Sequence, residues 1–425
     1  MLAYLRNSFL PSSRPSQNRS ARPLLESLEE RLLLYSTYGG TWTYGSRITY
    51  SFMPDGTSVG GTPSALFQTM NAKFPTTTPG TGVPGVPVWE TAIEQAAAVW
   101  EAVANINLAQ VPETLMPGST VGFPEGCSGD QQDDPRFGDI RIGAVDLGTS
   151  VLGETFLPPP NSGGTYAGDI FLNSNPIATW NTNSAYDLET VAIHEFGHAL
   201  GLGESQITTA CMYAYYNGTK QSLTSDDIAG IQSVWGAPQP DQFNSNGQNN
   251  DSPNTPANIT PYISSNGQIA IPNLRITNAC QPEWFSVTVP ASTTGTMVVT
   301  AQSANLSMLS PSLWLYKPGP KLPIAIGSAS STAYGATVSY SLAGVQAGQT
   351  YLIRALGNAA GNPTGGFGLE VNFGSATQPP IAPPNTVVLQ QPDQRGVVSA
   401  TSVQFPTGPQ VITIGNLSGK ATCTQ

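Results

Sequence analysis

Hydrophobic spacing changes along the chain and predicts a mixed N-terminal part. Residues 47–53 carry apolar side chains at every second position, which predicts a half-buried strand. Residues 88–107 instead repeat their apolar side chains at helical intervals. Trp89, Ile93 and Trp100 fall on one stripe of such a helix. We therefore expect an amphipathic helix here that packs over a sheet.

Two further strands and two helix starts are expected before residue 237. Alternating runs that follow loops rich in Gly and Pro predict strands at 139–145 and 168–173. Ser184 and Thr224 each stand three residues before an Asp, the arrangement of a helix-capping box. These boxes predict that one helix starts at each position.

Beyond a polar segment rich in Pro and Asn at 238–257, the helical pattern disappears. Short alternating strands are expected at 283–289, 296–301, 312–316, 336–342, 350–356 and 367–373. This regular spacing favours an all-β sandwich at 258–375. A Pro-rich connector and tail follow at 376–425. The tail is too short for a core of its own, so it completes the sandwich, binds a partner or is disordered.

Composition and charge exclude several classes of function. The net charge is −11 and the only basic block is near the N-terminus, so nucleic-acid binding has no electrostatic basis. No run of 18 apolar residues occurs, which excludes an ordinary transmembrane helix. A length of 425 residues predicts two or three domains, and the low charged fraction of 10% suits turn-rich extracellular β structure.

The four cysteines, Cys127, Cys211, Cys280 and Cys423, are far apart and form no C-x-x-C motif. An even number permits two disulfides in an exported protein. We expect the pairs Cys127–Cys211 and Cys280–Cys423. The two other connectivities and free buried thiols stay open as alternatives.

The only two histidines, His194 and His198, stand four residues apart. On an α-helix this spacing puts both imidazoles on one face, where they can bind one metal ion, usually zinc. Glu195 is placed to act as a general base on a metal-bound water. Gly201 allows the helix to stop sharply, so that Glu204 can return toward the metal.

The segment HEFGHALGLGE resembles the metzincin zinc signature H-E-x-x-H-x-x-G-x-x-H, with Glu204 in place of the third histidine. Met212 resembles the methionine that metzincins place beneath the zinc, and Ala214 favours the matrixins, especially their bacterial members. Segments 186–203 and 223–236 resemble two matrixin helices. The resemblance covers 38–237 and implies a zincin domain with a twisted mixed sheet and three helices. The fold class expected for the whole chain is therefore α+β, with an all-β sandwich after this domain.

The resemblance also implies an activity and a site. We expect one catalytic zinc held by His194, His198 and Glu204, with Glu195 as the base in hydrolysis of protein or peptide substrates. Water, or no third ligand at all, stays open in place of Glu204. A carboxylate ligand makes the bound water less acidic than a third imidazole would, which predicts a weaker or altered protease. The side chains that wall the pocket for the residue after the cleaved bond, or else belong to the core, are Tyr213, Tyr215 and Tyr216.

Matrixins also bind calcium in nearby loops, for which Asp139, Asp146, Asp169 and Asn173 are candidates in this sequence. In that family the strand before the zinc helix lies at the edge of the cleft, where an extended peptide adds by main-chain hydrogen bonds. The expected strand at 168–173 would take this place.

Both ends of the chain carry further resemblances. LLESLEERLLL within 1–37 is similar to a segment near the N-termini of many exported planctomycete proteins, which implies an export or processing segment and a secreted or cell-surface protein. Residues 258–375 resemble the bacterial pre-peptidase C-terminal domain, an accessory module of secreted proteases. Contact with a surface or a carbohydrate through this module is one expectation.

Two other functions stay open. The chain can be a catalytically degenerate zincin that acts as an extracellular binding or adhesion protein, because its third histidine is replaced by Glu204. A metal hydrolase of non-peptide substrates on the same scaffold has no feature in its favour. Zinc content and the effect of Glu204→Ala discriminate between the enzyme and the binding protein.

Overall fold

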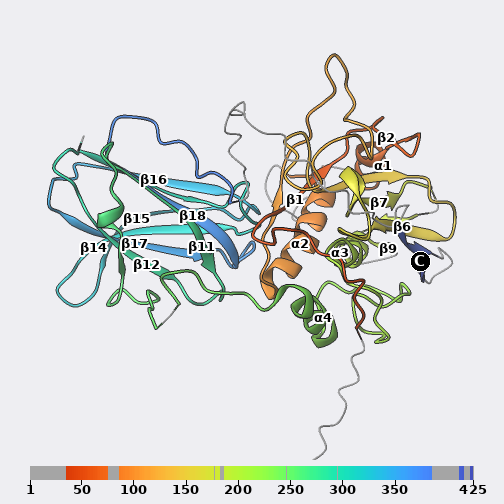
Figure 1. Cartoon of the computed structure of the whole chain (residues 1–425). Helices are drawn as coiled ribbons and strands as arrows, with labels where there is room; N and C mark the ends of the chain where they lie inside the picture. Colours follow the sequence, from red (N-terminus) through yellow and green to blue (C-terminus); the bar gives the residue numbers. More distant parts are fainter. Residues whose placement is uncertain are drawn as a thin grey trace, which may run out of the picture. The chain divides into compact units, whose positions relative to one another are not determined.

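A seven-stranded sheet organises the N-terminal part of the computed structural model (Figure 1). The structure describes residues 35–74, 86–176, 178–181, 186–245, 247–293 and 295–384, and the backbone of 411–415 and 422–424. The strand order is β4-β1-β5-β7-β6-β19-β20. The first five in this order are β4 (Leu108–Gln110), β1 (Ile48–Phe52), β5 (Ile140–Val145), β7 (Ile170–Asn173) and β6 (Val151–Phe156). Strands β4, β1, β5 and β7 run parallel, and β6 is antiparallel to β7.

The three expected helices are present as α2 (Val88–Val103), α3 (Leu188–Ala199) and α4 (Ser225–Trp235). Helices α2 and α3 lie side by side in Figure 1, and the indole of Trp100 donates to the Ile193 carbonyl oxygen across 2.9 Å. The smaller elements are α1 (Leu66–Lys73), η1 (Gly164–Tyr166), β2 (Ser58–Val59), β3 (Thr62–Pro63), β8 (Trp180–Asn181) and β9 (Tyr186–Asp187). Helix α3 packs both against α2 and directly on strands β6 and β7 of the sheet, which fixes the helix that carries the two histidines.

The two expected capping boxes have different outcomes. The box of Thr224 and Asp227 at the start of α4 is confirmed, with both hydrogen bonds present. At α3 the prediction is wrong, because Asp187 is itself the N-cap and accepts a hydrogen bond from the Thr190 amide. Ser184 lies outside the described residues. The S-x-x-D spacing therefore placed this helix start about one turn too early.

The edge of the sheet next to the histidine helix is also not where the sequence placed it. The expected strand at 168–173 is β7, which lies between β5 and β6. Strand β6, which the sequence analysis missed, runs outside it. On the side away from β7, strand β6 pairs with β19 (Val411–Gly415), and β19 in turn pairs with β20 (Thr422–Thr424). The backbone of the tail thus extends the N-terminal sheet.

Two sheets build the C-terminal β part, defined as residues 257–373. One has the order β10-β12-β17-β14-β15 and the other β11-β18-β13-β16. Their bounds are β10 (Ala257–Asn258), β11 (Gln268–Ile276), β12 (Glu283–Thr288), β13 (Thr296–Gln302), β14 (Pro311–Lys317), β15 (Ile324–Ser330), β16 (Thr337–Ala343), β17 (Thr350–Gly357) and β18 (Gly365–Asn372), with η2 at Thr260–Tyr262. Phe285 from one sheet and Phe367 from the other belong to a single buried cluster.

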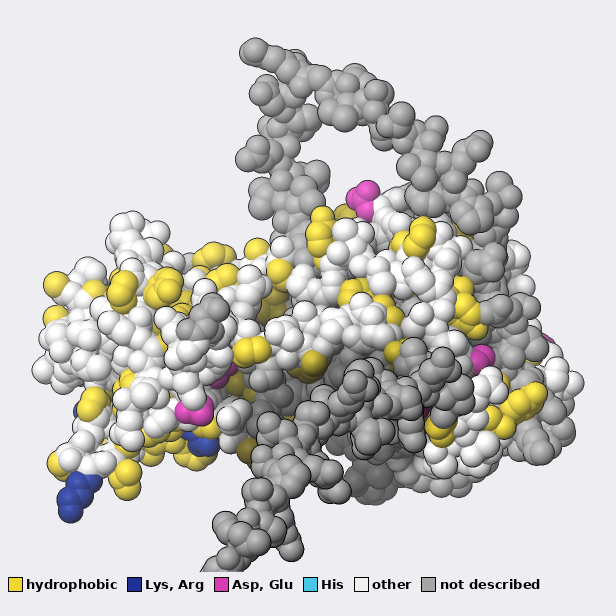
Figure 2. Space-filling view, turned by 60° about the horizontal axis from the view of Figure 1, so that its bottom comes forward, with side chains coloured by type: hydrophobic (Ala, Val, Ile, Leu, Met, Phe, Trp, Pro, Cys, Tyr) yellow, Lys and Arg dark blue, Asp and Glu magenta, His cyan; other side chains and the backbone are white. Residues whose placement is uncertain are grey.

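Charged side chains are sparse among the described residues on the face drawn in Figure 2, and no histidine is visible there. Within the described part of the chain, no helix is long and apolar enough to cross a membrane.

Cys127, Cys211 and Cys280 are free, so the expected pairs Cys127–Cys211 and Cys280–Cys423 are both wrong. The alternative of free thiols holds for these three residues.

Candidate metal centre

Helix α3 points the two histidines at one place and fixes their ring nitrogens. The Nδ1 atom of His194 lies 2.8 Å from the Cys211 carbonyl oxygen, and Nδ1 of His198 lies 2.9 Å from that of Leu202. A carbonyl oxygen only accepts, so each Nδ1 carries the proton and donates. The two Nε2 atoms, 2.9 Å apart, therefore present their lone pairs to the same point.

A sharp turn after α3 brings Glu204 to the same point. Gly201 has φ of 101°, and a Cβ there would meet the Gly40 carbonyl oxygen at 2.4 Å, so only glycine fits. The Ser36 carbonyl accepts from the Gly203 amide, and the Ser36 hydroxyl donates to the Glu204 carbonyl oxygen. Ser36 belongs to the segment that the sequence assigned to export or processing. It helps to hold the residue after the turn.

The three side chains have the spacing of a metal-binding group. Nε2 of His198 lies 3.4 Å from Oε1 of Glu204, and Nε2 of His194 lies 4.0 Å from its Oε2. One potential ligand atom from each residue lies within 4.8 Å of the other two. No other such group of His, Cys, Asp or Glu occurs in the part of the chain that the structure describes.

This donor set fits zinc. Two imidazoles and a carboxylate, with a fourth position left for water or substrate, is a recognised set in catalytic zinc sites. Tetrahedral zinc with bonds of about 2.1 Å separates two nitrogen ligands by about 3.4 Å. The observed 2.9 Å between the Nε2 atoms requires only a small adjustment of the rings. We conclude that the residues present can hold the ion.

The histidines differ in their affinity for protons. Burial, together with the neighbouring His198, lowers the pKa of His194 to about 4, so this ring is neutral at pH 7. Burial acts to lower the pKa of His198 as well, but the hydrogen bond and charge of Glu204 outweigh it and raise that pKa. Glu204 therefore favours positive charge at the centre, whether from a proton or from a metal ion.

Glu195 is completely buried beside the histidines. Its Oε2 accepts a short hydrogen bond from the Thr155 hydroxyl on β6, and its Oε1 has no hydrogen-bond partner among the described residues. Burial raises the pKa of Glu195 to about 8, against the opposing effects of His198 and Thr155. A divalent cation next to it would favour the ionised carboxylate. A Cβ at Gly153 would lie 2.4 Å from Oε1, so glycine leaves the room that this carboxylate needs.

Met212 is buried against the histidine helix. It is 2% exposed, and a Cβ at Gly197 would meet its sulfur at 2.2 Å. The Asp227 carboxylate accepts from the amides of Cys211 and Met212, each across 3.0 Å. The capping acid of α4 therefore also fixes the turn that carries Met212.

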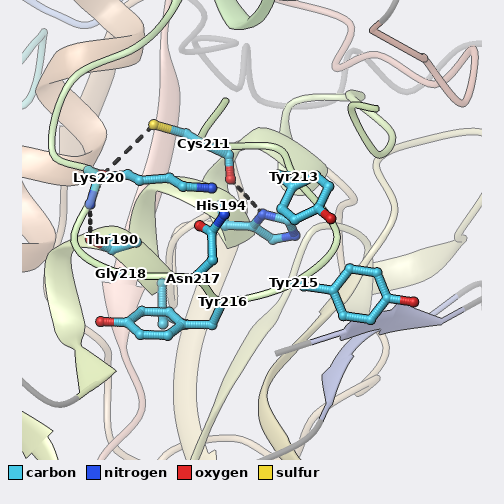
Figure 3. Close-up of a pocket in the computed structure, with 10 residues that line it drawn as sticks. Thr190, His194, Cys211, Tyr213, Tyr215, Tyr216, Asn217, Gly218 and Lys220 are labelled. Atoms are coloured by element: carbon cyan, nitrogen blue, oxygen red, sulfur yellow. Dashed lines mark hydrogen bonds between the residues drawn. The ribbon is translucent and has the colours of Figure 1, made fainter. Parts of the chain in front are cut away.

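His194 also lines a pocket (Figure 3). All three predicted tyrosines line it, so the structure brings Tyr213, Tyr215 and Tyr216 together. The Tyr216 hydroxyl accepts from the Asp187 amide across 2.9 Å, and Tyr215 is 42% exposed. Val191, Lys220 and Cys211 also line the pocket, together with Thr190, Asn217 and Gly218.

The predicted calcium residues serve internal hydrogen bonds. Asp139 accepts from the Thr49 and Asp133 amides, and Asp169 accepts from the Arg141 amide. Asp146 accepts from the Gly148 amide, and Asn173 accepts from the Leu147 amide. A calcium site at these residues stays a prediction.

Sequence reasoning missed four residues that position the centre or line its pocket: Thr155, Gly153, Lys220 and Asp227 as a support of the methionine turn. Thr155 and Gly153 lie on the missed strand β6, opposite Glu195. Asp227 gave a signal only as a cap. Lys220 gave none, because its position depends on the path of the loop after Met212.

Comparison with known proteins agrees with this geometry. Residues 85–236 match the family model described as Matrixin. Over 150 residues the chain is 33% identical to karilysin of Tannerella forsythia, covering 35% of this chain and 29% of karilysin. Over 147 residues it is 40% identical to matrilysin of Rattus norvegicus, covering 34% of this chain and 49% of matrilysin.

The hatching enzyme of Paracentrotus lividus is 36% identical over 147 residues, which cover 34% of this chain and 22% of that enzyme. The chain thus spans less than half the length of each of these relatives. The matched segment includes both histidines, Glu195, Glu204 and Met212. Residues 85–236 are therefore a matrixin domain, of the type found in zinc metalloendopeptidases.

Proposed function

We propose that this protein is an exported zinc-dependent endopeptidase in which Glu204 is the third zinc ligand. The observation that carries the proposal is the convergence of His194, His198 and Glu204 within 4.8 Å beside the buried Glu195. A site that had lost its activity would not need to retain both Glu204 next to the histidines and the buried carboxylate of Glu195. The binding-protein alternative predicts neither.

The chain's own residues account for proton movement in the reaction. His194, His198 and Glu204 would hold a zinc ion, which would polarise the scissile carbonyl and make a water molecule more acidic. Glu195 takes a proton from that water as it attacks the carbonyl carbon, and later gives it to the leaving amine nitrogen. The C–N bond breaks to give a carboxylic acid and an amine, which become carboxylate and ammonium by proton transfer, without a covalent enzyme intermediate. The Thr155 hydroxyl keeps Glu195 oriented toward the reacting water.

The substrate backbone binds in extended form along β6, on the side where β19 pairs in the structure. Its side chain after the cleaved bond enters the pocket walled by Tyr213, Tyr215 and Tyr216. The hydrogen bond between Thr155 and Glu195 supports this placement, because it joins β6 directly to the proposed base.

For the rest of the chain we infer an export or processing segment at 1–37 and an accessory β-sandwich at 258–375. Two sheets that share one buried cluster support the sandwich. The low charged fraction of 10% supports an extracellular location.

Zinc analysis and one variant test the proposal. Metal-replete protein should contain near-stoichiometric zinc and cleave casein or gelatin. Glu195→Ala should retain the zinc and lose about 10²- to 10⁴-fold in activity, the usual contribution of a general base. Zinc far below one per chain, without cleavage by the unaltered protein, would support the binding-protein alternative.

A further inference from the structure

We propose that Lys220 makes the pocket beside His194 selective for a long side chain that ends in a carboxylate or carboxamide. Glutamate or glutamine would then be favoured at the position after the cleaved bond. The inference rests on the proposed function, because it requires this pocket to receive that side chain. It goes beyond it by naming the chemistry of the preferred residue.

The ammonium group of Lys220 is the only ammonium or guanidinium group among the described residues that line this pocket, whose other polar side chains include Thr190 and Asn217. Lys220 lines the pocket together with Val191, Tyr213 and Tyr216. Its Nζ lies 5.1 Å from the centre of the Tyr213 ring, and in Figure 3 its side chain extends from the Thr190 side toward His194. The cation therefore belongs to the pocket and not to the outer surface.

The position of Lys220 is fixed at both ends of the residue. Its amide donates to the Thr190 hydroxyl across 2.8 Å, and its Nζ donates to the Ala210 carbonyl oxygen across 2.8 Å. A lysine ammonium has three N–H donors. Ala210 is the one acceptor found for them among the described residues. Two donors thus stay available to a ligand oxygen.

The charge of Lys220 is not neutralised locally. No carboxylate of the described residues forms a salt bridge with it. The charge of Asp227 acts on Lys220 from a distance, but that carboxylate already accepts from the Cys211 and Met212 amides. A half-buried cation next to apolar walls is stabilised by an anionic or strongly polar partner.

A glutamate or glutamine side chain provides such a partner. Its methylene groups can contact Val191 and the tyrosine rings, while its terminal oxygen accepts from Nζ. A leucine in the same place would cover the ammonium without giving it an acceptor, which costs binding free energy. Selectivity thus follows from the donors that an apolar ligand leaves unsatisfied.

Matched peptides that differ only after the cleaved bond test this inference. We expect kcat/KM to follow Glu and Gln above Leu and Met. Lys220→Met keeps the length of the side chain and should lower kcat/KM for the Glu peptide roughly 10- to 100-fold, the contribution of a charged hydrogen bond. The Leu peptide should change by less than about threefold or improve. Lys317→Met, at an exposed lysine on β14, is the matched control and should alter neither.

A binding measurement separates selectivity from catalysis. Product peptides with N-terminal Glu or Leu are titrated into metal-free protein, and Lys220→Met should reverse or abolish their ratio of Kd values. The inference is overturned if the unaltered protein prefers Leu, or if Lys220→Met weakens both peptides equally. Absence of any cleavage that depends on Glu195 overturns the proposed function instead.

Discussion

The two sides of His194 are built in different ways. On the metal side, His194, His198 and Glu204 come from one short segment, and helical spacing plus a single glycine turn bring them together. On the pocket side, Val191 of α3 meets Tyr213 and Lys220 from a loop that folds back over the helix. Chemistry here rests on local geometry, whereas selectivity rests on the path of a loop.

The largest effect should come from removing the carboxylate on the metal side. Glu204→Ala leaves two imidazoles as ligands, and we expect zinc affinity to fall by more than about 100-fold, since even outer contacts contribute 10- to 100-fold. The pocket side should persist, so product peptides should still bind with the same preference. Competition with a zinc chelator measures the affinity, with Asp130→Ala at an exposed acid as control. Unchanged zinc affinity would remove Glu204 from the ligand set.

Asp227 supports both the metal side and the pocket side, so its replacement should destabilise both. Its carboxylate accepts from the amides of Cys211, Met212 and Thr224, which Asp227→Ala leaves without a partner. We expect a loss of about 2–4 kcal/mol in the free energy of unfolding, measured in urea. Asp227→Asn, which keeps one oxygen acceptor, should lose less. A variant that stays within 1 kcal/mol and binds zinc normally would show that other contacts hold the turn.

A smaller effect, dependent on pH, tests whether the pocket side is rigid. Burial, followed by the charge of Asp227, raises the pKa of the Cys211 thiol to about 12. Only the thiolate reacts, and at pH 8 it makes up about 10⁻⁴ of such a group. Iodoacetamide should therefore modify the exposed Cys280 long before Cys211, and the rate at Cys211 should rise tenfold per pH unit up to its pKa. Peptide mapping by mass spectrometry gives both rates.

Equal rates at Cys211 and Cys280 at pH 8 would contradict this prediction. The loop would then open often enough to expose the thiol. In that case Lys220 would occupy several positions, and selectivity at the pocket would be weak.

The sequence predicted the metal side because its information is local. The spacing of the histidines and the helix stop at Gly201 are visible within a single segment, and the structure brings Glu204 to the histidines. Strand β6 was missed because Gly153 and Glu154 interrupt its apolar pattern. The lack of a side chain at Gly153 leaves room for Glu195, which lies far away in sequence. The edge of the cleft was therefore assigned to the wrong strand.

The pocket side could be predicted only in part. The three tyrosines follow Met212 closely, and their role was inferred from that position. Lys220 depends on how residues 213–219 cross the helix, which no periodic pattern encodes. The expected bridge between Cys127 and Cys211 failed for the same reason, because sequence separation says nothing about where the thiols meet.

The strand β19 carries a consequence for affinity. It runs antiparallel along β6 from Val411 opposite Phe156 to Gly415 opposite Val151, on the edge where the proposed substrate adds. A segment tethered in the same chain acts as a competitor at an effective concentration on the order of millimolar. Under the proposed function a substrate would have to displace β19, and the apparent Kd of that substrate would equal its intrinsic Kd divided by the fraction of molecules in which the edge is free. The tail would raise the apparent Kd of every peptide that adds to this edge by the same factor, so only peptides of high intrinsic affinity would bind at low concentration.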